Sequence, residues 1–217
     1  MGDIITFLWD TMVFLVSLLT SLVMTLYHLV VPPVQKSVVG EVAVVTGAGQ
    51  GIGREIAKQL AVIGVKVACW DVKEKEVNEV VEDIVRDGGE AIAVIIDVTD
   101  KDEIKKAAAQ TVFNLGHVTI LVNNAGIMPC KPLLSFTDEE VELQFSVNVF
   151  SNFWTIQQFL PLMLQQDHGH IVAMASVAGL NGAPNLTPYC STKFAVRGLM
   201  DSLFHELRAL IILQEKC

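Results

Sequence analysis

The chain has 217 residues, of which 52% are hydrophobic and 18% are charged, and its formal net charge is −9. An acidic chain lacks the basic surface that nucleic-acid binding requires, and so apolar a composition excludes intrinsic disorder. The four cysteines form no CxxC pair and have no metal-ligand spacing, which argues against a disulfide scaffold and a metal site. The length suits one domain with an appendage.

The first 36 residues differ in composition from the rest of the chain. With histidine counted as neutral, the run Thr11–Gln35 carries no charge and is long enough to cross the hydrocarbon layer of a membrane, about 30 Å, as a helix. A cleaved signal peptide fits poorly because Asp3 and Asp10 precede the run, and a buried core helix would be shorter. We expect residues 1–36 to be a membrane or lipid-droplet anchor, either spanning or monotopic.

From residue 41 onward, short apolar runs alternate with helical patterns. The expected strands are 41–46, 65–70, 91–96, 118–122 and 170–175, and the expected helices are 51–63, 73–86, 101–115, 138–164 and 187–213. Strands that are apolar throughout belong to parallel sheets with helices on both faces. The pattern predicts a doubly wound α/β domain of the Rossmann type over residues 37–217.

A glycine-rich sequence, TGAGQGIG at 46–53, lies between the first expected strand and helix. Gly47 permits a sharp turn, Gly51 lets the backbone approach a pyrophosphate, and Gly53 lets the helix pack closely on the strand. Ordinary turns also use glycine, but this position before a helix N-terminus favours a dinucleotide phosphate loop. The loop residues expected at the cofactor are Gly47, Gly49, Gln50, Gly51, Ile52 and Gly53.

Two aspartates follow the next strands. Asp71 follows the second strand, where a carboxylate can accept hydrogen bonds from the adenosine ribose and would repel a 2′-phosphate. We therefore expect NAD(H) rather than NADP(H), although Asp71 is also a plausible helix cap. Asp97 ends the third strand and is either an adenine contact or a turn residue.

A catalytic pattern follows in the last third of the chain. Tyr189 and Lys193 are four residues apart, so a helix places both on one face. An ammonium beside a phenol stabilises the phenolate, which makes the phenol a usable general acid or base. Ser176, after the fifth strand, can hold a substrate oxygen. The pattern YxxxK alone occurs by chance, but here the glycine loop and NNAG at 123–126 accompany it.

These motifs together resemble the short-chain dehydrogenase/reductase family over residues 41–210. The resemblance implies an active-site tetrad of Asn148, Ser176, Tyr189 and Lys193. It also implies cofactor contacts by Asn124, Ala125, Gly126, Tyr189 and Lys193. By analogy, Asn148 holds a water in a proton relay from Lys193; taken alone, Asn148 is simply a polar residue inside a helix.

The stretches KSVVGEVAVVTGAGQGIGR, DHGHIV and PYCSTKFA resemble a narrower branch. That branch contains the lipid-droplet 17-beta-hydroxysteroid dehydrogenases and the epidermal retinol dehydrogenases. The resemblance implies an apolar steroid- or retinoid-like alcohol or carbonyl as substrate, without deciding between them. It also implies attachment to the endoplasmic reticulum membrane or a lipid droplet, with a cytosolic catalytic domain, and assembly as a homodimer.

The C-terminus departs from the family pattern. Only residues 194–217 follow Lys193, whereas family members continue with two more strands and a segment that covers the substrate. We therefore expect a domain that is incomplete at its C-terminus, with an apolar strand edge. Two classes of function remain: an anchored NAD-dependent alcohol dehydrogenase, and a catalytically silent form or partner subunit on a membrane or lipid-droplet surface.

Overall fold

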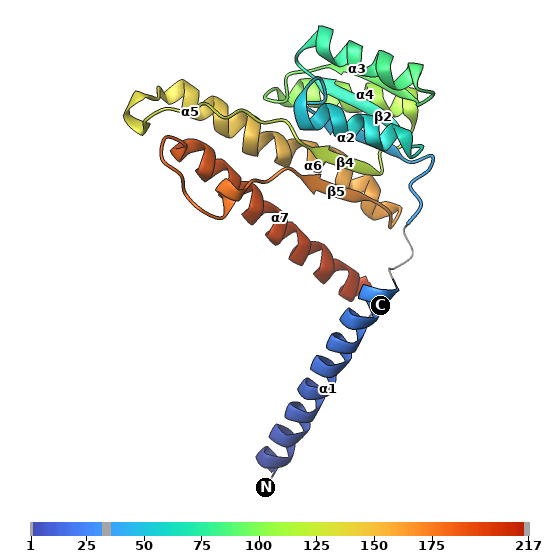
Figure 1. The fold of residues 1–217 in the computed structure, drawn as a ribbon, viewed down its shortest axis with the longest axis vertical. Helices are drawn as coiled ribbons and strands as arrows, with labels where there is room; N and C mark the ends of the chain where they lie inside the picture. Colours follow the sequence, from blue (N-terminus) through green and yellow to red (C-terminus); the bar gives the residue numbers. More distant parts are fainter. Residues whose placement is uncertain (1, 32–35, 215–217) are drawn as a thin grey trace. The chain divides into compact units, whose positions relative to one another are not determined.

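The computed structural model describes residues 2–31 and 36–214 and divides the chain into two units, 1–37 and 38–217. The first unit is a single helix, α1 (Gly2–Val30; Figure 1). Its segment Thr6–His28 is long and apolar enough to cross a membrane. The hydroxyls of Thr11 and Thr20 donate to carbonyls one turn back, at 2.8 Å, so these polar groups are satisfied within the helix.

Within the described residues, the second unit contains a five-stranded parallel sheet in the order β3-β2-β1-β4-β5. The strands are β1 (Val42–Thr46), β2 (Lys66–Asp71), β3 (Ala91–Ile95), β4 (Ile120–Asn123) and β5 (His170–Ala173). The helices are α2 (Gly51–Val62), α3 (Glu74–Arg86), α4 (Lys101–Leu115), α5 (Asp138–Phe145), α6 (Ser151–Gln165) and α7 (Thr187–Gln214). The predicted doubly wound α/β class is confirmed. The strand order reverses between β1 and β4, which is where such folds bind ligands.

Successive residues of a strand point to opposite faces of the sheet and pack into two separate hydrophobic cores. Ala43 and Val45 of β1 pack with α2 and α3, whereas Val44 packs on the other face with α4 and α6. Trp70 of β2 is fully buried in the second core, and its indole Nε1 donates to Thr111 Oγ1 at 3.0 Å. Both faces are thus covered, as the continuous apolar strands predicted.

The single long helix expected over 138–164 is interrupted. A capping box of Thr137 and Glu140 starts α5, and one π turn, η2 (Ser146–Phe150), separates α5 from α6. The extra residue of a π turn changes which side chains face inward, and here it turns Asn148 into the protein, where 1% of the residue is exposed. The sequence prediction missed this turn because both sides of it have helical periodicity.

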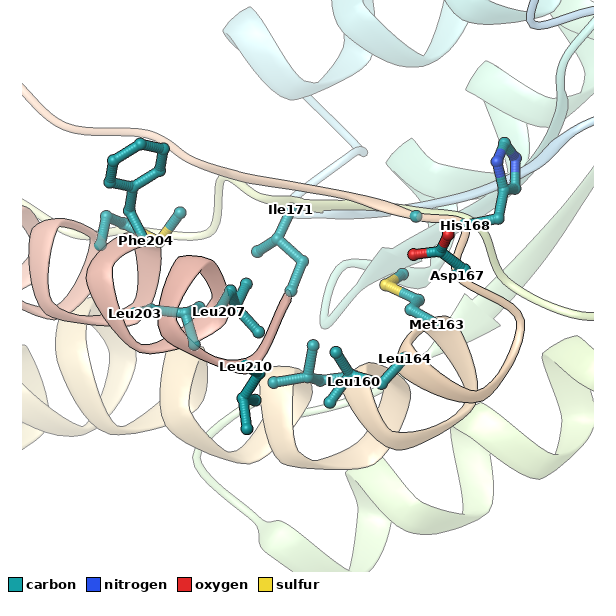
Figure 2. A pocket seen from close by; sticks show the side chains of 12 residues that line it. Leu160, Met163, Leu164, Asp167, His168, Ile171, Leu203, Phe204, Leu207 and Leu210 are labelled. Carbon is teal, nitrogen blue, oxygen red and sulfur yellow. The ribbon is translucent and has the colours of Figure 1, made fainter. Parts of the chain in front are cut away.

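Strand β5 and the last helix are only partly covered. Within the described residues, β5 pairs with β4 on one side and with no strand on the other, and Val172 is 46% exposed. A hollow of about 480 Å³ lies between α6, β5 and α7 (Figure 2). Leu160, Ile171 and Leu203 face this hollow from the three elements. The apolar strand edge that the sequence predicted is therefore present.

Candidate active site

The glycine-rich loop connects β1 to α2 in a tight turn. Gly47 and Gly51 have φ values of +65° and +57°, in the left-handed region that favours glycine. A Cβ atom on Gly47 would lie 2.9 Å from the Cα of Ala125, and one on Gly53 would collide with the carbonyl oxygen of Gly47. A Cβ on Gly51, by contrast, would meet nothing within 4 Å. The loop is thus packed on one side and open to an approaching anion on the other.

A hydrogen-bond bracket joins this loop to the end of β4. Thr46 Oγ1 accepts from the backbone N–H groups of Asn124 and Ala125, each at 3.0 Å. Asn124 Nδ2 donates to the carbonyl oxygens of Thr46 and Gly47 at 3.0 and 3.2 Å. The bracket fixes the loops after β1 and β4 to each other at the reversal of strand order. Sequence reasoning gave Thr46 no role, although it begins the glycine motif.

The Asp71 carboxylate holds two backbone segments. Its Oδ2 accepts from Gly49 N–H at 2.8 Å, and its Oδ1 accepts from Lys73 N–H at 2.9 Å. Asp71 therefore orients the glycine loop as well as facing the hollow beside it. Asp97 accepts from the N–H and Oγ1 of Thr99 at 2.9 and 2.8 Å, so it is a turn residue that also lines the hollow.

This hollow, of about 390 Å³, extends along the carboxyl ends of the strands. It is lined by Gly47, Gln50, Gly51, Ile52, Asp71, Val72, Lys73, Ile96, Asp97, Val98, Asn124, Ala125, Gly126, Ile127 and Val147. A dinucleotide requires a carboxylate for its ribose, a helix N-terminus for its phosphates and apolar walls for its adenine. The lining of the hollow offers all three, so these residues fit such a cofactor. Of the residues expected at the cofactor, Gly49, Gly53, Tyr189 and Lys193 are not part of this lining.

Tyr189 and Lys193 lie on one face of α7, as their spacing predicted. Lys193 is 5% exposed, and its Nζ lies 5.8 Å from the centre of the Tyr189 ring. The ammonium donates to the carbonyl oxygen of Met174 at 2.6 Å, which fixes it at the end of β5. Burial lowers the pKa of Lys193 below its ordinary value. The pair therefore places a positive charge, held by the sheet, beside a phenol.

Ser176 is the N-cap of the 3₁₀ turn η3 (Val177–Gly179), which follows β5 after a short link. Its Oγ accepts from Ala178 N–H at 3.1 Å. The turn packs closely on α7, because a Cβ on Gly179 would lie 2.8 Å from the carbonyl oxygen of Lys193. Ser176 and Lys193 thus belong to one packed assembly at the carboxyl end of the sheet.

Asn148 connects the loop of Ile127, at the hollow, to α7, the helix that carries Tyr189 and Lys193. Its Oδ1 accepts from Ile127 N–H at 2.8 Å, and its Nδ2 donates to Ile127 O at 2.9 Å and to Thr192 Oγ1 at 3.1 Å. Thr192 in turn donates to the carbonyl oxygen of Tyr189 at 2.7 Å. A Cβ on Gly126 would lie 3.4 Å from Asn148 Oδ1 and 3.8 Å from Lys193 Nζ, so the three residues meet.

Sequence reasoning missed Thr192. The residue is fully buried and next to Lys193, but a single threonine inside a helix carries no pattern of its own. Its adjacency to the YxxxK motif was the one signal available.

Comparisons with known proteins agree with this geometry. The model of the family described as short chain dehydrogenase matches residues 41–213. The chain is 39% identical to estradiol 17-beta-dehydrogenase 11 of Mus musculus over 204 residues, which are 94% of this chain and 68% of that protein. It is 38% identical to 17-beta-hydroxysteroid dehydrogenase 13 of Homo sapiens, over 93% of this chain and 67% of the relative. It is 39% identical to epidermal retinol dehydrogenase 2 of Mus musculus, over 89% of this chain and 62% of that protein.

Solved structures give the same assignment. A short chain dehydrogenase/reductase from Burkholderia phymatum in complex with NAD matches with a TM-score of 0.79 and 35% identity, over 81% of this chain and 63% of that one. A metagenomic short-chain oxidoreductase in complex with NADP matches with a TM-score of 0.76 and 34% identity, over 80% and 79%. The chain spans about two thirds of the length of the curated relatives it matches. It belongs to the short-chain dehydrogenase family of nicotinamide-dependent oxidoreductases and is related to steroid and retinol dehydrogenases.

Proposed function

We propose that the chain carries the nucleotide site and catalytic residues of a membrane-anchored, NAD(H)-dependent oxidoreductase. The proposed reaction interconverts an apolar steroid- or retinoid-like alcohol and its carbonyl compound. The observation that carries the proposal is the set of hydrogen bonds made by Asn148. These bonds connect Ile127, which lines the hollow, through Thr192 to α7, the helix of Tyr189 and Lys193. The names of the related steroid and retinol dehydrogenases support the substrate class.

The residues around the hollow would hold the cofactor at three points. The N-terminus of α2, with Gly47 and Gly51, offers backbone N–H groups to the pyrophosphate. Asp71 would accept hydrogen bonds from the adenosine ribose and would disfavour a 2′-phosphate, which supports NAD(H) over NADP(H). When bound, the nicotinamide ring supplies the hydride acceptor or donor.

Tyr189 is the proposed general acid and base. Its phenolic oxygen takes the proton of the alcohol in oxidation and returns a proton to the carbonyl oxygen in reduction. The Lys193 ammonium, fixed by Met174 O, stabilises the phenolate by its charge. Because Ser176 Oγ already accepts the Ala178 N–H, its own proton can point to the substrate oxygen and stabilise charge there.

Asn148 has a structural part in this proposal. All three hydrogen bonds of its side chain go to Ile127 and Thr192, and its backbone carbonyl accepts from Asn152 Nδ2 at 2.9 Å. We assign Asn148 to holding the loop after β4 at the correct distance from Lys193. The water in a proton relay from Lys193, which the family resemblance implies at Asn148, is a further part of this proposal.

We further propose that residues 1–36 anchor the protein and that residues 37–217 form the catalytic domain. The apolar surface of α1 supports attachment to the endoplasmic reticulum membrane or a lipid droplet, with the catalytic domain in the cytosol. Such a surface would concentrate an apolar substrate near the site. Association of two copies is part of the same proposal.

A catalytically silent protein is the second candidate function. The apolar hollow beside β5 favours it, because within the described residues no strand pairs with the outer edge of β5 and the hollow offers an apolar surface to a partner. Such a protein would bind the nucleotide without turning over an alcohol.

The test measures cofactor binding and turnover separately, on the full chain in detergent micelles. NADH binding is followed by fluorescence, and turnover is followed with NAD⁺ and estradiol or retinol. Tyr189→Phe should keep NADH binding and lose turnover. Equal turnover by Tyr189→Phe and the unmodified chain would refute the role of Tyr189, whereas NADH binding without turnover by the unmodified chain would establish the silent alternative.

A further inference from the structure

The charges around the cofactor hollow are unevenly distributed. Among the described residues that line it, Asp71 and Asp97 carry negative charge and Lys73 carries the one positive charge. Asp71 and Lys73 are both at the end where the adenosine ribose is proposed to bind. A cation here matters because the ribose of NADP(H) carries a 2′-phosphate at the same place.

Lys73 is held at its backbone by Asp71 and at its exposed side chain by one hydrogen bond to Gln50. Its N–H donates to Asp71 Oδ1 at 2.9 Å, which places the start of the side chain beside that carboxylate. Its Nζ donates to Gln50 Oε1 at 2.9 Å, and both side chains are exposed. Since Gln50 precedes α2 and Lys73 precedes α3, the pair joins the starts of the two helices at the edge of the hollow.

The two cations of α2, Arg54 and Lys58, already form ion pairs with Asp83. The guanidinium of Arg54 lies 2.7 Å from the carboxylate of Asp83, and the ammonium of Lys58 lies 3.1 Å from it. Lys73 instead donates to a neutral amide, and an anion can displace that amide because it adds the attraction between two opposite charges to the hydrogen bond. Lys73 is therefore the cation that a 2′-phosphate can recruit.

We propose that Lys73 is a cofactor-specificity residue that allows the hollow to accept NADP(H) as well as NAD(H). The inference rests on the proposed dinucleotide site. The ammonium leaves Gln50 and binds the 2′-phosphate, and it thereby offsets part of the repulsion from Asp71. Glu74 and Glu76 in the first turn of α3 add negative charge, so NAD(H) stays the preferred cofactor, but by a narrower margin than Asp71 alone would give.

The experiment compares ligands with and without the 2′-phosphate on the full chain in detergent micelles. Binding of NADH and NADPH is measured by fluorescence, and binding of 5′-AMP and 2′,5′-ADP by calorimetry. Lys73→Met should weaken NADPH and 2′,5′-ADP by about tenfold, the size of one charge-assisted hydrogen bond, and leave NADH and 5′-AMP within about twofold. The loss should shrink as salt rises.

Two further variants make the test specific. Lys75→Met removes an exposed lysine in the first turn of α3, whose Nζ lies 3.9 Å from Glu79 Oε1, and should leave the affinity for all four ligands unchanged. Gln50→Leu removes the side chain that competes for Lys73 and should strengthen the binding of NADPH relative to that of NADH. A similar loss of NADH and NADPH in Lys73→Met, or no change in either, would overturn the inference while leaving the dinucleotide site intact. Failure of the unmodified chain to bind either dinucleotide would overturn the site and the inference together.

Discussion

Asn148→Ala should destabilise the catalytic domain and weaken its binding of NADH. The side chain is almost fully buried and makes three hydrogen bonds, two to the backbone of Ile127 and one to Thr192. Alanine removes all three and leaves a space that the π turn η2 cannot refill without shifting. The loop that carries Ile127, which lines the cofactor hollow, would then lose its attachment to α7.

The expected magnitude follows from the number of bonds lost. Neutral hydrogen bonds contribute about 0.5–1.5 kcal/mol each, so the loss of three lowers the free energy of unfolding by about 2–4 kcal/mol. For a domain of this size, Tm falls by about 2–4 °C per kcal/mol, which gives a decrease of roughly 5–15 °C. Thr192 keeps its bond to Tyr189 O, so α7 itself should remain helical.

Thermal unfolding and NADH titration measure the two effects. Asn114→Ala is the matched control, because Asn114 is an exposed asparagine whose Nδ2 donates to Gln110 O within α4 at 2.7 Å. The control should change Tm by less than about 2 °C, since exposed substitutions rarely exceed 0.5 kcal/mol. If Asn148→Ala is as stable as the Asn114→Ala control and has unchanged NADH affinity, the proposed role of the Asn148 hydrogen bonds is refuted.

Three other predictions concern separate parts of the domain. Gly53→Ala should abolish NADH binding in a titration, because the added Cβ collides with Gly47 O and displaces the phosphate loop; unaltered affinity would contradict the packing of that loop. Asp83 has its pKa lowered from 3.8 to about 2 by hydrogen bonds from Lys58, Arg86 and Arg54, so its ion pairs stabilise the fold above pH 4 and are lost as the pH falls toward 2. Denaturation at several pH values should show that Asp83→Asn is less stable than the unmodified chain at pH 7. The difference in stability should disappear as the pH falls from 4 toward 2; a difference that stays constant would contradict the stabilising role of the ionised Asp83. Burial raises the pKa of the Cys69 thiol to about 12, so iodoacetamide at pH 8 should label the exposed Cys130 and spare Cys69 until the protein unfolds, as mapped by peptide mass; early labelling of Cys69 would be inconsistent with the core.

Local patterns predicted the fold and most of the candidate site. The glycine loop is a contiguous motif between a strand and a helix, and Tyr189 and Lys193 are one helical turn apart, so neighbours in sequence were sufficient to place them. The strands were found within about two residues because each is a short apolar run between polar turns.

Long-range packing determined what the sequence did not predict. The π turn at Asn148 depends on partners at Ile127 and Thr192, which lie 21 and 44 positions away in the chain. The contact of Lys73 with Gln50 likewise joins two helix starts that are 23 residues apart. No periodicity or motif records such pairs, and they become visible only when the sheet has brought the segments together.

The central claim is that Tyr189 transfers a proton while a hydride passes between substrate and cofactor. The most direct measurement uses estradiol or retinol that carries deuterium on the alcohol carbon, with NAD⁺, and follows the label into NADH by mass spectrometry. The account predicts labelled NADH from the unmodified chain, and none from a Tyr189→Phe variant that still binds NAD⁺. Equal labelling by the two proteins, or no label from an unmodified chain that binds NAD⁺, would contradict it.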